Sequence, residues 1–263
     1  MADTDGTQGG AVPRIVHLDK MTMGGVAIPR PAIAHDWAEH DFTEPHEVVE
    51  RLAGAQVAII NKVRMDAATL AALPDLRLIA VTATGTDVVD KAAAEARGIQ
   101  VRNVVGYAGT TVAEHVIMLV FALARGLIPF RESVIDGRWE TGKAFCVFAA
   151  PVRDLVGQRF GLIGSGAIAQ GVASRARALG MEVVFAGRQG AEPGEGKLPF
   201  EEVLATSDII SLHCPLTPET NHLFNARTLG LMKPGARIIN TARGALIDLE
   251  ALEAALDSGQ IGG

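Results

Sequence analysis

Two glycines stand where a short apolar run gives way to a helical pattern. The segment reads Gln158-Arg-Phe-Gly-Leu-Ile-Gly-Ser-Gly-Ala-Ile-Ala169, with Gly164 and Gly166 after the run and Ala169 at the third small position. A glycine turn lets the backbone approach a pyrophosphate, and the unpaired N–H groups at the helix start attract its negative charge. Alanine is accepted at the third position, which needs only a small side chain. The string is typical of a dinucleotide site, although glycine turns join strands to helices in many other folds.

An arginine follows the next predicted strand, where such sites often carry a carboxylate. About 20 residues past the glycine motif, an Asp or Glu would bind the adenosine ribose hydroxyls and repel a 2′-phosphate. Here Gly187 holds that place and Arg188 follows. Because a guanidinium pairs with a phosphate through two hydrogen bonds, this exchange favours NADP(H), with NAD(H) as the alternative cofactor. The competing interpretation is a solvated arginine in a loop rich in glycine and proline.

The elements around the motif predict an α/β architecture. The apolar run at 160–163 predicts a strand buried on both faces, followed by a helix to about Leu179. Further strands are expected at 181–186, 209–213 and 237–240, with helices at 200–205, 225–232 and 248–256. Before the motif, apolar runs at 15–18, 32–34, 57–60, 76–81 and 99–104 alternate with helical patterns at 47–52, 66–73 and 88–96. That alternation predicts a second parallel sheet.

Two domains are expected, because 263 residues exceed a typical domain of about 150. Residues 1–10 form an acidic, polar leader that is expected to be disordered. Residues 11–107 are expected to form one domain and residues 108–263 the other. The longest helical pattern, 110–127, is apolar on nearly every face, which predicts burial between layers. In it, His115 is expected to be structural.

Composition argues against several kinds of partner. The net charge of -6 offers no attraction to nucleic acid or to an anionic membrane surface, and the apolar run at 116–124 is too short to span a bilayer. The two cysteines, Cys146 and Cys214, show no disulfide framework, which fits a reducing cytoplasm. No metal site is expected. A small-molecule ligand is therefore favoured.

The loop at 82–87 follows a predicted strand and precedes a helix. Ligands of open α/β sheets bind beyond the carboxyl ends of the strands, and such a loop offers N–H groups to an anion. The alternative is a simple helix start capped by Asp87.

Four motifs together resemble the D-isomer-specific 2-hydroxyacid dehydrogenases. They are ATGTDVVDKAAAEARGI at 83–99 with TVAEH just beyond, GLIGSGAIAQ, LHCPLTPET at 212–220 and INTARGALIDLEAL at 239–252. The resemblance covers the chain from about residue 50. It implies two open parallel-sheet domains: a flavodoxin-like substrate domain and a Rossmann dinucleotide-binding domain. It also implies hydride transfer between a nicotinamide cofactor and a small D-2-hydroxy acid or 2-oxo acid, as in glycerate dehydrogenase. The AGRQ string around Arg188 is similar to the NADP-using glyoxylate and hydroxypyruvate reductases.

The same resemblance implies roles for individual residues. Arg243 would bind the substrate carboxylate and polarise the carbonyl that receives hydride. Thr84 and Gly85 would face the substrate carboxylate and the cofactor, in a cleft between the domains that closes on its ligand. The remaining implied cofactor contacts are Ala167 and Ile168 at the pyrophosphate, and Cys214, Thr241 and Ala242 on the nicotinamide side.

The resemblance also implies groups that the sequence does not contain. The family places a catalytic Glu shortly beyond the position of Gly263 and an acid/base His further on, and none of the seven histidines matches. Reduction of an oxo acid needs a proton donor near the carbonyl oxygen. The Rossmann domain is therefore expected to be incomplete at its C-terminal end, with an unpaired strand edge and impaired catalysis.

Other interpretations stay open beside the dehydrogenase. One is a dinucleotide-sensing interaction protein, similar to the family's corepressor relatives, in which nucleotide binding controls assembly. Another is formate dehydrogenase, which shares the fold. Family members are often homodimers built through the cofactor domain, and the apolar helix at 110–127 is compatible with that assembly.

Overall fold

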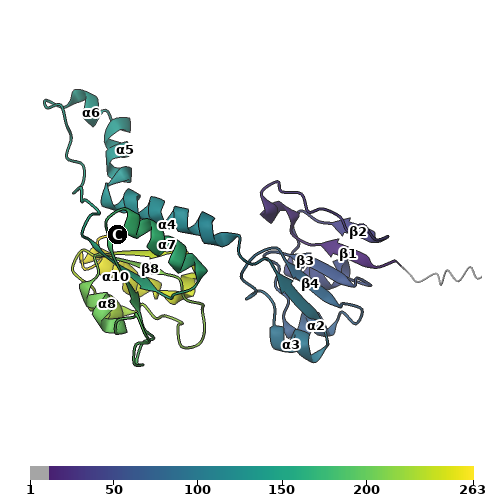
Figure 1. The fold of residues 1–263 in the computed structure, drawn as a ribbon. Helices are drawn as coiled ribbons and strands as arrows, with labels where there is room; N and C mark the ends of the chain where they lie inside the picture. Colours follow the sequence, from purple (N-terminus) through teal and green to yellow (C-terminus); the bar gives the residue numbers. More distant parts are fainter. Residues whose placement is uncertain (1–11) are drawn as a thin grey trace, which may run out of the picture. The chain divides into compact units, whose positions relative to one another are not determined.

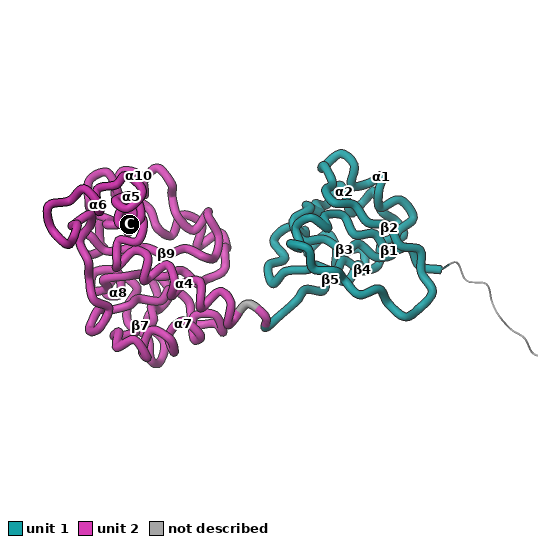
Figure 2. The backbone as a smooth tube through the Cα atoms, turned by 90° about the horizontal axis from the view of Figure 1, so that it is seen from above, with its two compact units in different colours: residues 1–106 teal, residues 107–263 magenta. Residues whose placement is uncertain are grey.

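The computed structural model describes residues 12–263, apart from the side chain of Ala108. The predicted leader of residues 1–10 lies outside the described residues. The chain forms two compact units: unit 1 extends to Gly106, and unit 2 runs from Tyr107 to Gly263 (Figure 2). The sequence-based boundary at 107/108 lies one residue from this division.

Unit 1 contains a five-stranded parallel sheet in the order β2-β1-β3-β4-β5 (Figure 1). Its strands are β1 (Arg14–His17), β2 (Asp36–Glu39), β3 (Val57–Ile60), β4 (Leu78–Val81) and β5 (Gln100–Asn103). The connecting helices are η1 (Lys20–Met23), η2 (Pro45–Glu47), α1 (Val48–Arg51), α2 (Ala67–Ala71) and α3 (Lys91–Ala96). This is the strand order of flavodoxin-like folds, and its direction reverses between β1 and β3.

Two sequence-based expectations in unit 1 are wrong. The run at 32–34 is not a strand; β2 lies at Asp36–Glu39 and pairs with β1 as a sheet edge. An edge strand exposes polar side chains, here Asp36 and Glu39, so a search for apolar runs overlooks it. The helix after the 82–87 loop begins at Lys91, and its N-cap is Asp90 rather than Asp87, with the carboxylate accepting the Ala93 N–H at 3.0 Å.

Unit 2 contains a four-stranded parallel sheet in the order β7-β6-β8-β9. Its strands are β6 (Arg159–Ile163), β7 (Glu182–Ala186), β8 (Ile209–Leu212) and β9 (Arg237–Asn240). Single parallel bridges extend both edges, since Leu198 pairs with Ala186 of β7 and Ile261 pairs with Ala236 at the start of β9. With these bridges the chain follows the 3-2-1-4-5-6 order of the Rossmann fold. The start of the β9 edge, predicted to be unpaired, is therefore covered by residues 261–263, where Ile238 donates its N–H to the Gly263 carbonyl.

Helices cover both faces of this sheet. On one face α4 (Ala108–Ala124) packs beside α7 (Ala167–Ala178), and both contribute to a core around Phe160 and Leu162. The other face is covered by α8 (Phe200–Thr206), α9 (Ala226–Gly230), η3 (Gly244–Leu246) and α10 (Leu249–Asp257). The remaining helices, α5 (Leu127–Ile135) and α6 (Arg138–Thr141), stand away from the sheet (Figure 1).

Helix α4 is buried on one side only. Val116 and Val120 are fully buried, whereas Met118 and Phe121 are 51% and 41% exposed. His115, expected to be structural, is exposed on this helix. Among the described residues no single helix is long and apolar enough to cross a membrane; α4 and α5 reach that length only together, with a bend of 62° between them.

Candidate active site

The glycine bend between β6 and α7 is open. Gly164 has φ +105°, and a Cβ atom there would lie 2.7 Å from the carbonyl carbon and oxygen of His213, so only glycine fits. Gly166 is the N-cap of α7 and makes no side-chain cap, and a Cβ built on it would meet nothing within 4 Å. The bend is therefore open at Gly166, next to the backbone N–H groups that begin α7 and have no partner within the helix. Such N–H groups attract an anion such as a pyrophosphate.

Close packing behind the bend explains the small residues of α7. Ala169, at the third position of the motif, is fully buried. A Cβ at Gly171 would lie 2.9 Å from the Gly109 carbonyl oxygen and 3.3 Å from the Ala113 Cβ. Larger side chains would push α7 away from α4 and the sheet, and the N-terminus of α7 would move with them.

The carboxyl ends of four parallel strands gather the predicted residues of unit 2 along one edge. Since β6, β8 and β9 are neighbours, the residues that follow them are neighbours too, and the His213 N–H donates to the Ile163 carbonyl at 2.7 Å. This edge carries Gly164, Gly166, Ala167 and Ile168 after β6, Arg188 after β7, Cys214 after β8, and Thr241, Ala242 and Arg243 after β9.

Arg188 is exposed at the end of β7. The pKa of the Glu219 carboxyl is lowered, first by the hydrogen bond that it accepts from the Thr217 hydroxyl at 2.7 Å and to a smaller extent by the charge of Arg188. The loop after β8 thus comes near this arginine. A Cβ at Gly187 would lie 3.0 Å from the Cα of Pro193, so a carboxylate at residue 187 would have to displace the glycine- and proline-rich loop.

Two buried polar atoms at this edge have no partner among the described residues. They are His213 Nε2 and Thr241 Oγ1. Leaving such a group unpaired costs about 1–3 kcal/mol, so a ligand with amide or hydroxyl groups would be favoured there. Burial lowers the pKa of His213 to about 4, and burial raises the pKa of the Cys214 thiol. Both side chains are therefore neutral at physiological pH.

Asn240 fixes the loop that carries Arg243. The Asn240 Oδ1 accepts the Ala242 N–H at 3.0 Å, and its Nδ2 donates to the Arg243 carbonyl at 2.8 Å. The Arg243 Nη1 in turn donates to the Ala242 carbonyl at 3.0 Å. Asn240 was not among the residues predicted from the sequence, although its position at the end of a predicted strand was a usable signal.

In unit 1 the loop after β4 is tied to the end of β5. The Thr84 hydroxyl donates to the Val104 carbonyl at 3.1 Å, and Asn103 Nδ2 donates to the Thr84 carbonyl at 2.7 Å. Thr84 and Gly85 therefore lie at the carboxyl edge of their sheet. Asp19, a buried carboxylate two residues after β1, lies at the same edge and was not among the residues predicted from the sequence.

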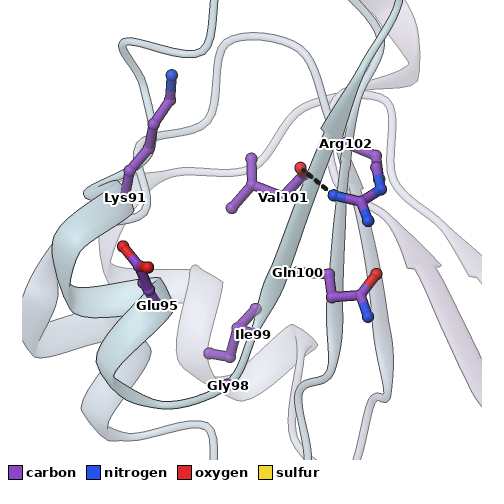
Figure 3. A pocket seen from close by; sticks show the side chains of 7 residues that line it. All are labelled: Lys91, Glu95, Gly98, Ile99, Gln100, Val101 and Arg102. Carbon is purple, nitrogen blue, oxygen red and sulfur yellow. Dashed lines mark hydrogen bonds between the residues drawn. The ribbon is translucent and has the colours of Figure 1, made fainter.

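Two grooves are formed elsewhere in the structure, and the second of them reaches Asn240 at the end of β9. One, of about 330 Å³, runs between α3 and β5; Lys91 and Glu95 lie on its helical side, and Ile99 and Val101 on its strand side (Figure 3). The other, of about 780 Å³, runs between α4, α5 and the outer edge of β9 and includes Arg153. Neither groove contains a predicted site residue.

Comparison with known proteins gives consistent matches. A family model described as D-isomer specific 2-hydroxyacid dehydrogenase, NAD binding domain, matches residues 117–263. A glycerate dehydrogenase of Methylorubrum extorquens is 48% identical over 255 residues, covering 95% of this chain and 79% of the relative. A hydroxypyruvate reductase of Blautia hydrogenotrophica is 34% identical, covering 84% and 70%. A solved acyclic imino acid reductase (Bsp5), in complex with NADPH and D-Arg, superimposes with a TM-score of 0.79 at 28% identity, covering 95% of this chain and 81% of that one.

Proposed function

The chain belongs to the D-isomer-specific 2-hydroxyacid dehydrogenase family of nicotinamide-dependent oxidoreductases, and we propose that it interconverts hydroxypyruvate or glyoxylate with the corresponding 2-hydroxy acid, using NADP(H) in preference to NAD(H). One observation carries this proposal: the open glycine bend of unit 2 shares a sheet edge with the loop of Arg243. A site for the cofactor diphosphate and a site for a carboxylate therefore face the same side of the sheet.

The residues of this edge fit a dinucleotide. Gly164 lets the bend pass close to the His213 backbone, and Gly166 leaves room for the diphosphate. The N–H groups of Ala167 and Ile168 attract its charge. Thr241, Ala242 and Cys214 would hold the nicotinamide side. When bound, the nicotinamide ring supplies or accepts the hydride.

The preference for NADP(H) rests on Arg188. Its guanidinium is exposed at the end of β7 and can pair with a 2′-phosphate, while Gly187 supplies no carboxylate to repel one. The reductase that superimposes on this chain was solved in complex with NADPH, which is consistent with this preference.

Arg243 is proposed to bind the substrate carboxylate through its planar guanidinium and to polarise the carbonyl that accepts hydride. A proton must also reach the carbonyl oxygen. His213 does not suit that task, since its pKa of about 4 keeps it at neutral pH as the uncharged imidazole, which is a very weak acid. The raised pKa of Cys214 makes its thiol a poor donor as well.

The test is a comparison of two cofactors and three oxo acids. NADPH and NADH binding is measured by nucleotide fluorescence, and oxidation of each is followed with hydroxypyruvate, glyoxylate and pyruvate. We expect tighter NADPH binding and higher kcat/KM for hydroxypyruvate or glyoxylate than for pyruvate. Failure of both nucleotides to bind would reject the proposal, and equal binding would reject the NADP(H) preference.

We further propose that the protein is a homodimer that uses the α5–α6 arm, defined as residues 127–150. This arm stands away from the unit 2 sheet and carries exposed apolar side chains, with Phe145 and Phe148 exposed by 95% and 92%. Exposed apolar area of this kind is typical of an interface. Light scattering of the protein and of a Phe145→Ser, Phe148→Ser variant tests the dimer. Assembly that depends on NADPH without turnover would favour the dinucleotide-sensing alternative.

Both cysteines are free thiols, which supports a reducing, cytoplasmic location.

A further inference from the structure

The short turn η3, which follows Arg243, is hydrogen-bonded to a segment from another part of unit 2. The His222 N–H donates to the Ala245 carbonyl at 2.8 Å, and the Phe224 N–H donates to the Leu246 carbonyl at 3.0 Å. These bonds lie outside the named strands of the sheet. Residues 222–224, called the clamp segment below, therefore bind the turn directly after the arginine.

The clamp segment is anchored in the core of unit 2. Phe224 is fully buried, and its ring lies edge to face with that of Phe200 on α8, with 6.2 Å between the ring centroids. The Leu223 carbonyl accepts the Thr228 hydroxyl of α9 at 2.9 Å. The Phe224 carbonyl accepts the Asp248 N–H at 2.8 Å, just before α10. Because the segment cannot shift without opening this packed core, the turn that it binds is held in place.

His222 has an unusual backbone conformation. Its φ is +50°, and within residues 12–263 it is the only residue other than glycine with a positive φ. Histidine tolerates this conformation better than most residues do, but the conformation remains strained. Such strain persists only where the surrounding contacts fix the backbone, and it is concentrated near functional sites. Here the strained residue is the one that donates to the Ala245 carbonyl, two positions after Arg243.

The ring of His222 lies beside the N-cap of α10. Its Nδ1 is 3.9 Å from Asp248 Oδ2, and both side chains are partly exposed. The Asp248 carboxylate also accepts the Ala251 N–H at 3.2 Å, which caps the helix. A contact between charged groups that is open to solvent adds little stability. Glycine would adopt the backbone conformation without strain, so stability alone does not explain a histidine at this position.

The loop of Arg243 is thus fixed on both sides of the arginine. Asn240 binds the Ala242 N–H and the Arg243 carbonyl, and the clamp segment binds the turn that follows. A guanidinium forms two parallel hydrogen bonds with a carboxylate only in a narrow range of orientations. The backbone that carries it must therefore be held on each side.

We propose that His222 and Asp248 are positioning residues for Arg243: they hold the clamp segment against η3 and so set the direction from which the arginine meets the substrate carboxylate. The inference rests on the proposed function, because it assumes that Arg243 binds a 2-oxo acid. Every contact of the clamp lies within unit 2.

The test uses oxamate, an unreactive analogue of a 2-oxo acid, and calorimetry on the NADPH-loaded protein. Asp248→Ala is expected to weaken oxamate binding about three- to tenfold, because the contact with His222 and the cap beside η3 are both lost. NADPH affinity is expected to stay within about twofold, since the glycine bend makes no contact with the clamp segment.

Asp66→Ala is the matched control. Asp66 is the N-cap of α2 in unit 1 and accepts the Thr69 N–H at 2.9 Å, as Asp248 accepts the Ala251 N–H. Loss of either cap should lower the melting temperature by a similar amount, about 2–6 °C. Only Asp248→Ala should weaken oxamate binding, so the pair of variants separates positioning from stability.

His222→Gly removes the ring and the backbone strain together. Its melting temperature should stay within about 2 °C of that of the unaltered protein, while oxamate binding weakens about three- to fivefold. Hydrogen exchange of the Phe224 amide should become at least about tenfold faster, with exchange of the Ile239 amide in β9 unchanged. His222→Asn should bind oxamate within about twofold of the unaltered protein, because asparagine tolerates a positive φ and can contact Asp248.

Equal oxamate binding by Asp248→Ala and Asp66→Ala, or unchanged binding by His222→Gly, would overturn the inference. A parallel loss of NADPH affinity would show that the whole sheet edge has moved, and would also overturn a specific effect on Arg243. Absence of oxamate binding to the unaltered, NADPH-loaded protein would reject the proposed function itself. That result is distinguishable, because it appears before any substitution is made.

Discussion

Gly164 and His213 touch through their backbones: a Cβ atom at residue 164 would lie 2.7 Å from the His213 carbonyl group. Gly164 also has φ +105°, a conformation that other L-residues rarely adopt. Gly166 differs in both respects, with φ -71° and nothing within 4 Å of its Cβ position. The first glycine of the motif therefore allows the end of β6 to lie close to the end of β8. The second glycine leaves space at the start of α7.

This difference predicts opposite effects for two similar substitutions. Gly164→Ala should lower the free energy of unfolding by about 2–4 kcal/mol, because strain and a backbone clash add together. Gly166→Ala should change that free energy by less than about 0.5 kcal/mol but weaken NADPH binding at least about tenfold, since its methyl group would enter the space for the diphosphate. Urea unfolding and nucleotide fluorescence measure the two quantities. Normal NADPH binding by Gly166→Ala would argue against a diphosphate at the bend.

Arg188→Ser should affect one cofactor only. A charge-assisted pair with the 2′-phosphate is worth about 1.5–3 kcal/mol, so NADPH affinity should fall about 10- to 150-fold while NADH affinity stays the same. Arg227→Ser, at an exposed arginine on α9, is the control and should alter neither affinity. A parallel loss for NADH would show that Arg188 supports the loop rather than the phosphate.

Arg243→Lys should separate substrate binding from cofactor binding. The ammonium cannot form the planar, two-pronged contact with a carboxylate, so oxamate binding to the NADPH-loaded protein should weaken about tenfold or more. NADPH affinity should be nearly unchanged. Calorimetry with both ligands checks this, and a loss confined to NADPH would contradict the assigned role.

Burial of His213 predicts a pH-dependent loss of stability. The folded pKa of about 4 lies below the unfolded value of 6.5, so on acidification the unfolded chain binds a proton before the folded protein does. Stability should therefore fall between pH 6.5 and pH 4, by up to about 2 kcal/mol at pH 5. His213→Gln should flatten this part of the profile of melting temperature against pH. His222→Gln, at a half-exposed histidine, should keep the slope of the unaltered protein.

Replacing Arg237 by an apolar residue should not lower the free energy of unfolding. It is 6% exposed, and burial, followed by the nearby charge of Arg153, lowers its pKa. The neighbouring Asp208 already binds Lys233 and the Arg159 N–H. A buried charge with poor pairing costs stability, so Arg237→Met should leave the free energy of unfolding unchanged or raise it by about 1 kcal/mol. A loss above about 2 kcal/mol in urea unfolding would show that Asp208 compensates the charge.

The sequence by itself determined the elements whose signals are local. The change from an apolar strand to a helical period around Gly164 located the glycine bend. The predicted helices at 66–73 and 248–256 begin at the observed N-caps, Asp66 and Asp248, because a cap bonds within three residues of itself. The strand at 237–240 was predicted with its observed ends. Edge strand β2 was missed, because its polar side chains remove the apolar signal.

Tertiary structure alone decided which of these segments meet. The Asp19 carboxylate accepts hydrogen bonds from backbone N–H groups 42 to 44 positions away. Neither segment carries a sequence motif that predicts its contact with the other. The contact of Gly164 with His213 likewise follows from β6 lying beside β8, and strand order is a property of the packed sheet. Local bonding preferences act over a few residues, whereas a site is assembled by the free energy of burying distant segments together.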